Sequence, residues 1–215
     1  MREVAKRIIK NCMFAAIVLF AFQVNAQNKK VNFVAEMSFG RVSYLSPSCL
    51  SVVNPEECDV TSFGMNLKMG VDLKGFTLKA DLSSFGGAYF YDALSQKREE
   101  TGTFYAGLEI GFNFNKSAFA ISPFIGVGML RYESNYAGYK FSGNGLGSSA
   151  GLSLAYNISE NFAVKASLGA VFGNINSISS NSKSIMAQET IESFDSYGGY
   201  PLCIGRSMIG VEVWL

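Results

Sequence analysis

The chain has 215 residues, and its 18 Lys and Arg residues nearly balance its 17 Asp and Glu residues. This balance gives no support to electrostatic nucleic-acid binding, which uses a positive surface. The chain contains no histidine, which excludes Ser-His-Asp and Cys-His catalytic arrangements and, with the wide cysteine spacing, argues against a zinc site. We therefore expect a single non-enzymatic domain without a metal and without a nucleic-acid partner.

Residues 1–26 have the features of a secretory signal peptide. A basic start precedes an apolar run from Met13 to Phe22 and a small-residue exit at Val24-Asn25-Ala26. A membrane-spanning helix needs about 20 apolar residues, and neither this run nor any later stretch reaches that length. We predict cleavage near Ala26, with residues 27–215 forming one exported domain.

Beyond this segment, apolar residues alternate with small or polar ones over strand-length stretches. The clearest stretch begins at Phe63 and alternates without error to Leu73, and a second begins at Phe76. A period of two predicts β-strands with one apolar and one polar face. Eight such strands are expected in chain order, at Val31–Tyr44, Phe63–Leu73, Phe76–Ser83, Thr103–Phe114, Phe119–Arg131, Leu146–Tyr156, Phe162–Phe172 and Leu202–Leu215.

The connections between the expected strands alternate in length. Three are short turns, at residues 74–75, 115–118 and 157–161. Four are long, at residues 45–61, 84–102, 132–145 and 173–201. Alternate connections of an up-and-down barrel lie at the same end, so one end carries the short turns and the other the long connections. This asymmetry is typical of barrels that span the bacterial outer membrane.

The predicted fold is therefore all-β: an eight-stranded antiparallel up-and-down transmembrane β-barrel with short periplasmic turns and long extracellular loops. The apolar face of each strand points toward lipid, and closure leaves no unpaired edge in the membrane. If this assignment of faces is correct, replacing outward Leu67 or Ile110 by Arg should block assembly. Replacing inward Ser83 by Ala should have little effect.

The polar face of the strands points into the predicted barrel. It consists mainly of small residues, with four cations and four anions among them and Glu36 as a further anion. Because an unpaired buried charge is costly, this balance predicts a salt-bridged network that plugs the lumen. A narrow ion path through the same charges is the alternative. The predicted network residues are Lys68, Asp72, Lys79, Asp81, Glu109, Lys165, Arg206 and Glu212.

Two segments carry a resemblance to a known family. Ser122–Met129 resembles the Pro-aromatic-apolar-Gly-x-Gly strand of the small outer-membrane β-barrel domain family, often called porin-like, and Asn157–Phe162 resembles its periplasmic turn. The likeness extends over Val31–Leu215 and points to the eight-stranded OmpA/OmpX type. It implies a monomer in the outer membrane of a Gram-negative bacterium, in contact with lipid and lipopolysaccharide and inserted by the assembly machinery. Family members commonly end in an aromatic residue, whereas here Trp214 is penultimate and Leu215 is last.

Other chemistry has weaker support in the sequence. Cys49 and Cys58 lie in a loop-like stretch of an exported chain, so we predict a local disulfide that leaves Cys203 unpaired. Gly145–Ala150 matches a G-x-G-x-x-A dinucleotide pattern, but its glycines open a strand and no helix follows, so we expect no cofactor. Lys165 and Ser167 share an inward face and are the arrangement left for a catalytic Ser-Lys pair.

The long connections are where recognition is expected, because loops on a rigid scaffold carry binding residues. The tyrosines of the third long connection, including Tyr132, are expected in an interfacial aromatic girdle. The leading hypothesis is a structural or surface-interaction role with an unknown extracellular ligand. The alternatives are a soluble exported barrel that binds an apolar ligand, which would need large apolar residues on its inner face, and a narrow pore.

Overall fold

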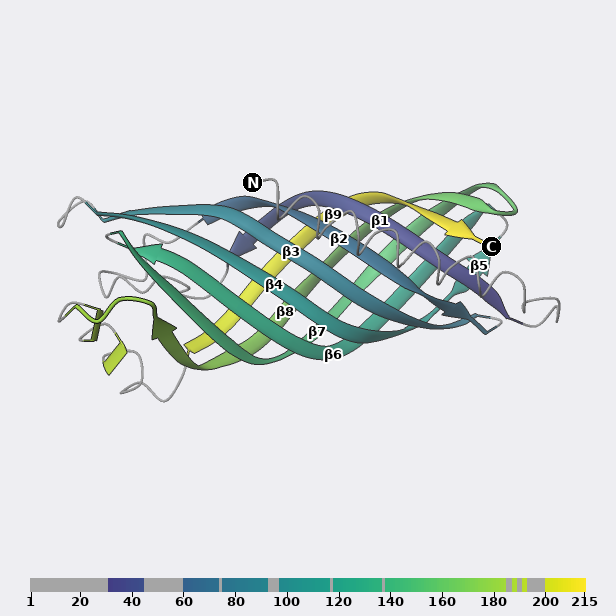
Figure 1. The fold of residues 1–215 in the computed structure, drawn as a ribbon. Helices are drawn as coiled ribbons and strands as arrows, with labels where there is room; N and C mark the ends of the chain where they lie inside the picture. The colour runs from purple at the N-terminus through teal and green to yellow at the C-terminus, as the bar shows by residue number, and fades with distance from the viewer. Residues whose placement is uncertain are drawn as a thin grey trace, which may run out of the picture.

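The computed structural model describes residues 31–44, 60–73, 75–92, 97–116, 118–136, 138–184, 187–188, 191–192 and 200–215. The predicted signal peptide and the predicted disulfide between Cys49 and Cys58 lie outside these residues. The described chain forms nine strands (Figure 1). They are β1 (Asn32–Tyr44), β2 (Val60–Asp72), β3 (Phe76–Asp92), β4 (Lys97–Phe112), β5 (Phe114–Lys116), β6 (Phe119–Tyr136), β7 (Tyr139–Ser159), β8 (Phe162–Ser180) and β9 (Tyr200–Trp214).

The strands close into an antiparallel barrel. Apart from β4 and β5, strands that are neighbours in the chain pair with one another, β1 pairs with β9, and β4 pairs with β6. β4 and β5 are two parts of one barrel strand, because both pair with β6 in a continuous register on either side of Asn113. The nine described strands therefore make a barrel of eight strands, which confirms the predicted fold. Figure 1 shows the strong tilt of the strands that closure of a sheet requires.

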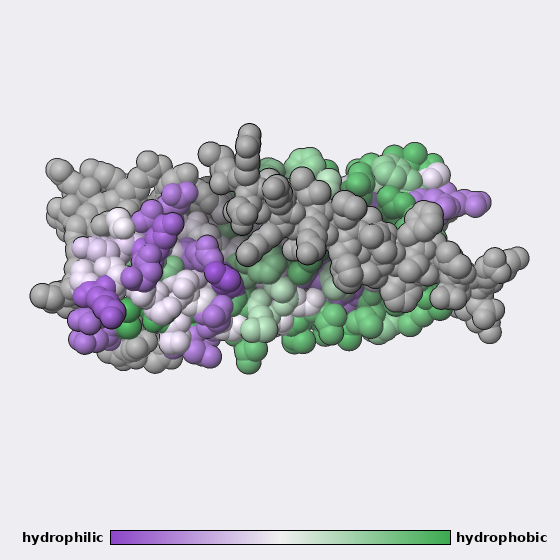
Figure 2. Space-filling view, viewed as in Figure 1, coloured by the Kyte–Doolittle hydropathy of each residue, from purple (hydrophilic) through white to green (hydrophobic). Residues whose placement is uncertain are grey.

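The outer surface of the wall is apolar and the inner surface carries the charges. Leu67, Ile125 and Leu168 are 39%, 65% and 66% exposed, whereas Lys68 and Lys165 are buried inside. Figure 2 shows apolar side chains over the part of the barrel nearer the short turns and polar side chains at the opposite end. A soluble barrel would present polar side chains to water on this outer face, so the soluble alternative does not fit the structure.

Two connections predicted to be long loops are instead extended hairpins. Most of segment 84–102 lies in β3 and β4, and segment 132–145 lies in β6 and β7, which meet at a turn where Gly138 has a φ of 85°. Where a strand extends beyond the apolar layer of the membrane, its outward positions no longer face lipid and need not be apolar. The alternation of apolar and polar residues therefore ends before the strand ends. We call this end of the barrel the hairpin end and the opposite end, with its short connections, the turn end.

The last residues of β9 close the barrel against β1 at the turn end. The Phe33 N–H donates to the Leu215 carbonyl over 3.2 Å, and the Leu215 N–H donates to the Phe33 carbonyl over 2.9 Å. Leu215 is 44% exposed on the outer face, whereas Trp214 packs against Ala155 and Ala163 on the inner face. Leu215, and not the neighbouring indole, therefore takes the outward place at the end of the strand. No helix among the described residues is long and apolar enough to cross a membrane.

Candidate functional site

The interior of the barrel holds a cluster of ion pairs between strands that are far apart in the chain. The Nζ atoms of Lys79 and Lys165 each contact a carboxylate oxygen of both Glu36 and Glu212, at distances between 2.5 and 3.1 Å. These four side chains are no more than 7% exposed. Two cations and two anions thus neutralise one another and link β1, β3, β8 and β9. We call them the first ion cluster.

A second ion cluster links β2, β3, β4 and β9. Lys68 Nζ lies 2.6 Å from Glu109 Oε2, and Arg206 lies 3.3 Å from Asp81 Oδ2. The guanidinium of Arg206 also reaches Glu109 at 3.8 Å, which joins the two pairs into one group. Its four charged side chains are no more than 5% exposed. Each charge of this cluster therefore has an opposite charge beside it, as a buried ion requires.

Ser83 belongs to the second ion cluster. Its hydroxyl accepts hydrogen bonds from Asn66 Nδ2 at 2.7 Å and Arg206 at 3.0 Å, and it donates to Asp81 at 2.7 Å. Its side chain is completely buried. This changes the expectation that Ser83→Ala is nearly silent, because the substitution leaves buried polar partners unsatisfied.

One aromatic ring packs against the cations of the second ion cluster. The centroid of the Phe124 ring lies 4.3 Å from Lys68 Nζ and 5.5 Å from Arg206 Cζ, within the range of cation–π attraction. A Cβ atom at Gly151 would collide with the Cζ atom of this ring, and one at Gly169 would lie 3.1 Å from it. The glycines of β7 and β8 therefore leave the space that the ring occupies inside the barrel.

Seven of the eight charged residues predicted to line the lumen lie in these two clusters together with Glu36, and Asp72 does not. The carboxylate of Asp72 accepts hydrogen bonds from the Gly75 N–H and from Asn113 Nδ2, both at 2.9 Å. Asp72 is the last residue of β2 and holds the turn that follows, beside a cavity of about 220 Å³ at the turn end. The alternation of the strand correctly predicted that Asp72 points into the barrel, but it did not predict the position of Asp72 along the barrel axis.

The alternative of a catalytic Ser-Lys pair at Lys165 and Ser167 is not supported by the geometry. Lys165 Nζ is bound by the two carboxylates of Glu36 and Glu212 at 2.7 and 2.9 Å. A lysine that acts as a base needs a free amine near the hydroxyl that it activates. Here the ammonium of Lys165 belongs to the first ion cluster.

Toward the hairpin end the interior is apolar, which the sequence analysis missed. Phe85, Tyr105 and Leu130 are at most 1% exposed, and Tyr132, expected in an outer girdle, is buried among them. These residues occupy inward positions where strands continue past the clear alternation. The sequence did contain a sign of this apolar interior, because bulky apolar residues such as Val42 occupy inward positions near the ends of strands. The apolar plug comprises Val42, Tyr44, Phe85, Tyr105, Leu130, Tyr132, Phe141, Val171, Ile175, Ile178, Ala187, Leu202, Ile204 and Met208.

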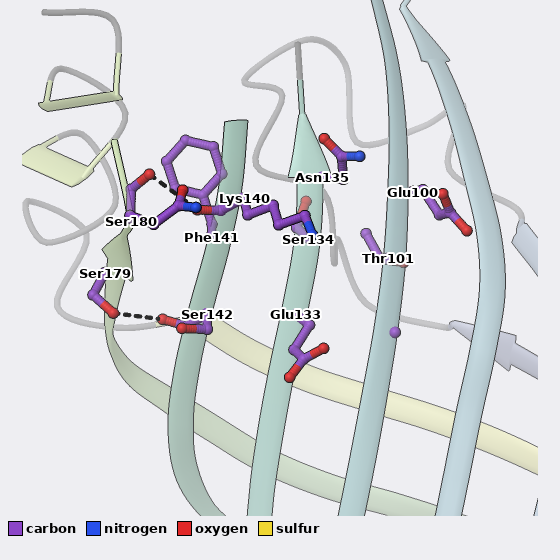
Figure 3. A pocket seen from close by; sticks show the side chains of 12 residues that line it. Glu100, Thr101, Glu133, Ser134, Asn135, Lys140, Phe141, Ser142, Ser179 and Ser180 are labelled. Atoms are coloured by element: carbon purple, nitrogen blue, oxygen red, sulfur yellow. Dashed lines mark hydrogen bonds between the residues drawn. The ribbon is translucent and has the colours of Figure 1, made fainter. Parts of the chain in front are cut away.

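The extended ends of β4, β6, β7 and β8 form a polar pocket at the hairpin end (Figure 3). Its cavity of about 750 Å³ is lined by charged, amide and hydroxyl side chains, among them Glu133 and Lys140. Ser179 donates to the Ser142 carbonyl at 3.3 Å, and Ser180 donates to the Lys140 carbonyl at 2.9 Å. Thr101 also lines the pocket, and its buried Oγ1 atom has no hydrogen-bond partner among the described residues. This pocket offers polar groups to a ligand.

Comparison with known proteins agrees with this architecture. The model of the family described as outer membrane protein β-barrel domain matches residues 12–191. No curated protein matches the chain. A major outer membrane protein from Thermus thermophilus is 13% identical, with 86% of this chain and 99% of that chain covered and a TM-score of 0.55. Ail, the attachment invasion locus protein of Yersinia pestis, is 10% identical, with 86% and 99% covered and a TM-score of 0.50. At these identities the likeness is one of fold.

Proposed function

The chain belongs to the outer membrane protein β-barrel domain family, and on this premise we propose that it is a non-enzymatic, non-conducting barrel that acts through its hairpin end. It is exported by cleavage of residues 1–26 and inserted into the outer membrane of a Gram-negative bacterium as a monomer. The turn end lies in the periplasm and the hairpin end lies outside the cell, the arrangement typical of such barrels.

The observation that carries this proposal is the double closure of the lumen. Across the barrel lie two ion clusters whose four cations and four anions are paired. Next to them lies the apolar plug, in which Phe85 and Tyr105 are fully buried. An eight-stranded barrel has an interior just wide enough for its side chains. Two such layers in succession would block the passage of ions.

The polar pocket supports a role in surface interaction. It lies at the hairpin end, where Glu133 and Lys140 place exposed charges along its lining. Ail is by its name a protein of attachment and invasion. The role that we propose for the hairpin end, a contact outside the cell, is of the same broad class. The predicted disulfide between Cys49 and Cys58 would brace the first long connection at this end.

Single-channel recording tests the closed lumen. The purified barrel, inserted into planar lipid bilayers in potassium chloride, should give no conductance steps. A variant with Tyr105→Ala and Leu130→Ala, which empties part of the apolar plug, is the matched comparison for a weakened lumen. Regular conductance steps from the wild-type protein would refute the non-conducting role and favour the narrow pore.

Labelling of intact cells tests the orientation. In a Cys203→Ser background, Lys140→Cys at the hairpin end should react with a maleimide that cannot cross membranes. The matched variant Ser159→Cys, exposed at the turn end, should react only after the cells are opened. The reverse pattern would show that the barrel is inserted the other way, and would remove the hairpin end as the outside surface.

A further inference from the structure

A short segment between β8 and β9 takes part in the apolar plug. Residues 187–188 and 191–192 of this connection are helical and lie at the hairpin end (Figure 1). Ala187 is completely buried within the plug, and Ile191 packs against it and is partly buried. The plug therefore consists of wall residues together with residues of a surface connection.

This segment has an apolar side and a polar side. Ala187 and Ile191 are four residues apart, and Gln188 and Glu192, each one position further along, are exposed. Residues four apart share one face of a helix, so the apolar face rests on the plug and the polar face meets water. We call the described residues 182–184, 187–188 and 191–192 the cap.

Alternate serines connect the cap to the wall of the barrel. The Ser180 hydroxyl, at the end of β8, donates to the Lys140 carbonyl of β7 over 2.9 Å and accepts a hydrogen bond from the Ser182 N–H over 3.2 Å. The Ser182 hydroxyl in turn accepts from the Ser184 N–H, also over 3.2 Å. A serine hydroxyl that binds the backbone two residues further on stabilises a turn, so these contacts lead the chain away from β8.

Ser184 begins the helical part of the cap. Its hydroxyl accepts a hydrogen bond from the Ala187 N–H over 3.2 Å, and its carbonyl accepts one from the Gln188 N–H over 3.1 Å. This is the geometry of a helix N-cap, in which a serine hydroxyl satisfies a backbone donor of the first turn. We call Ser180, Ser182 and Ser184 the serine ladder, and it runs from the β7 backbone to the buried Ala187.

The serine ladder begins in the polar pocket. Ser180 lines that pocket beside Ser179 and Asn181, so a contact made there acts on the hydroxyl that anchors the cap. At the other end of the ladder the apolar anchor is small, because the buried side chain of Ala187 is a single methyl group. Segments with few buried apolar contacts open at a low cost in free energy. We therefore expect the cap to leave the plug more readily than a wall residue such as Leu130 does.

We propose that the cap is a reversible lid on the lumen and that the serine ladder couples this lid to the polar pocket. When the cap lifts, apolar side chains of the plug face the outside of the hairpin end. A contact in the pocket that takes up the Ser180 hydroxyl favours the lifted state, and lifting changes the affinity of the pocket by the same factor. The lid deepens the proposed surface role and rests on it for its use in the cell. Its test on the purified barrel depends neither on orientation nor on conductance.

Cysteine labelling of the purified, folded barrel measures how often the cap lifts. In a Cys203→Ser background, Ala187→Cys is treated with a maleimide, and mass spectrometry of the digested protein gives the rate. Gln188→Cys, at an exposed position of the cap, is the comparison that needs no lifting. We expect Ala187→Cys to react more slowly by about tenfold or more, and to react completely while the barrel keeps its heat-dependent gel mobility. Equal rates would overturn a seated cap, and no reaction of the folded barrel would overturn a lid.

Variants of the serine ladder test the coupling. Ser180→Ala and Ser184→Ala should each speed the labelling of Ala187→Cys about fivefold, as the loss of one such hydrogen bond gives, and leave that of Gln188→Cys unchanged. Ser184→Asp keeps an N-cap acceptor and should restore the slow rate. Ser179→Ala is the matched control, because Ser179 donates to the Ser142 carbonyl outside the ladder. A rate at position 187 that Ser180→Ala leaves unchanged would overturn the coupling to the pocket.

Hydrogen exchange of the wild-type protein tests the lid without any substitution. The amides of Ala187 and Gln188 should exchange faster than the amide of Leu130 in the wall, because lifting of the cap leaves the barrel closed. One shared rate for all three amides would show that the cap opens only when the barrel unfolds, and would overturn the proposal.

Discussion

Lys165 on β8 reaches past β9 to place its Nζ atom 2.7 Å from the Glu36 carboxylate on β1. The ion clusters therefore connect strands that share no backbone hydrogen bonds. Glu36 receives a second cation, Lys79 of β3, at 3.1 Å. A side-chain network of this kind ties together the parts of the wall that the ladder of the sheet does not join directly.

Removing one member of the first ion cluster should be costly. Glu36→Gln leaves Lys79 and Lys165 to share the single carboxylate of Glu212, so one buried cation loses its counter-ion. We expect a loss of about 3 kcal/mol in the free energy of unfolding, measured by urea unfolding of the barrel in lipid vesicles. Glu133→Gln, which breaks a pair whose side chains are 62% and 61% exposed, should cost less than about 1 kcal/mol. Similar losses for the two variants would contradict the role of burial.

Removing a complete buried pair should cost less than removing its halves. Lys68→Met and Glu109→Leu each leave an unmatched buried charge, whereas the double variant keeps the interior neutral because Arg206 retains Asp81. We expect the double loss to be smaller than the sum of the single losses by about 2 kcal/mol, as coupling of a close pair gives. A double-mutant cycle of unfolding free energies measures this difference. Additive losses would show that the pair is not coupled.

A side chain added at a glycine that faces the apolar plug should lower the stability of the barrel. A Cβ at Gly147 would lie 2.8 Å from Leu130 Cδ1, so Gly147→Ala should lower the free energy of unfolding by about 1 to 3 kcal/mol. Adding Leu130→Val should restore part of the loss by making room. Gly86→Ala is the matched control, because no described residue other than its chain neighbours has an atom within 4 Å of the added Cβ. A loss that Leu130→Val leaves unchanged would locate the strain elsewhere.

A charge on the lipid face should prevent insertion. Leu67 and Ile110 are 39% and 38% exposed on the apolar outer surface, and an arginine near the membrane midplane costs about 2 to 4 kcal/mol. Leu67→Arg and Ile110→Arg should lose the heat-dependent mobility shift of the outer-membrane fraction on gels. Asn144→Arg, at an exposed position toward the hairpin end, should assemble normally. Normal assembly of both Leu67→Arg and Ile110→Arg would contradict the assignment of faces.

The sequence predicted the wall of the barrel better than its contents. Alternation identified the outward face because lipid demands apolar side chains at every second position, as in the run from Phe63 to Leu73. The short turns were found because their polar residues and glycines interrupt that run. Gly75, with a φ of 98°, is such a case. The closed eight-stranded barrel could therefore be predicted from periodicity and connection lengths, together with the features of a signal peptide in residues 1–26.

The interior could be predicted only in part, because parity gives a face and not a partner. It grouped Lys68 with Asp72, yet the structure pairs Lys68 with Glu109 and leaves Asp72 at a turn. The apolar plug was missed for a second reason. Leu130 and Tyr132 lie where outward positions turn polar, so the alternation that reveals strands in the membrane is lost there. The tilt of the strands sets the position of each residue along the barrel axis, and the alternation of residues in the sequence does not reveal this tilt.

The pairing of β1 with β9 also has a kinetic meaning. β9 brings Arg206 and Glu212, one charge of each sign, to partners on the earlier strands β3, β4 and β8. An open sheet of the first strands would expose Asp81 and Glu36 with incomplete partners, so no intermediate stage gains the full electrostatic benefit. Docking of β9 on β1 would then be an all-or-none step, and a half-closed sheet would be a high-energy species that folds onward or is cleared by proteolysis.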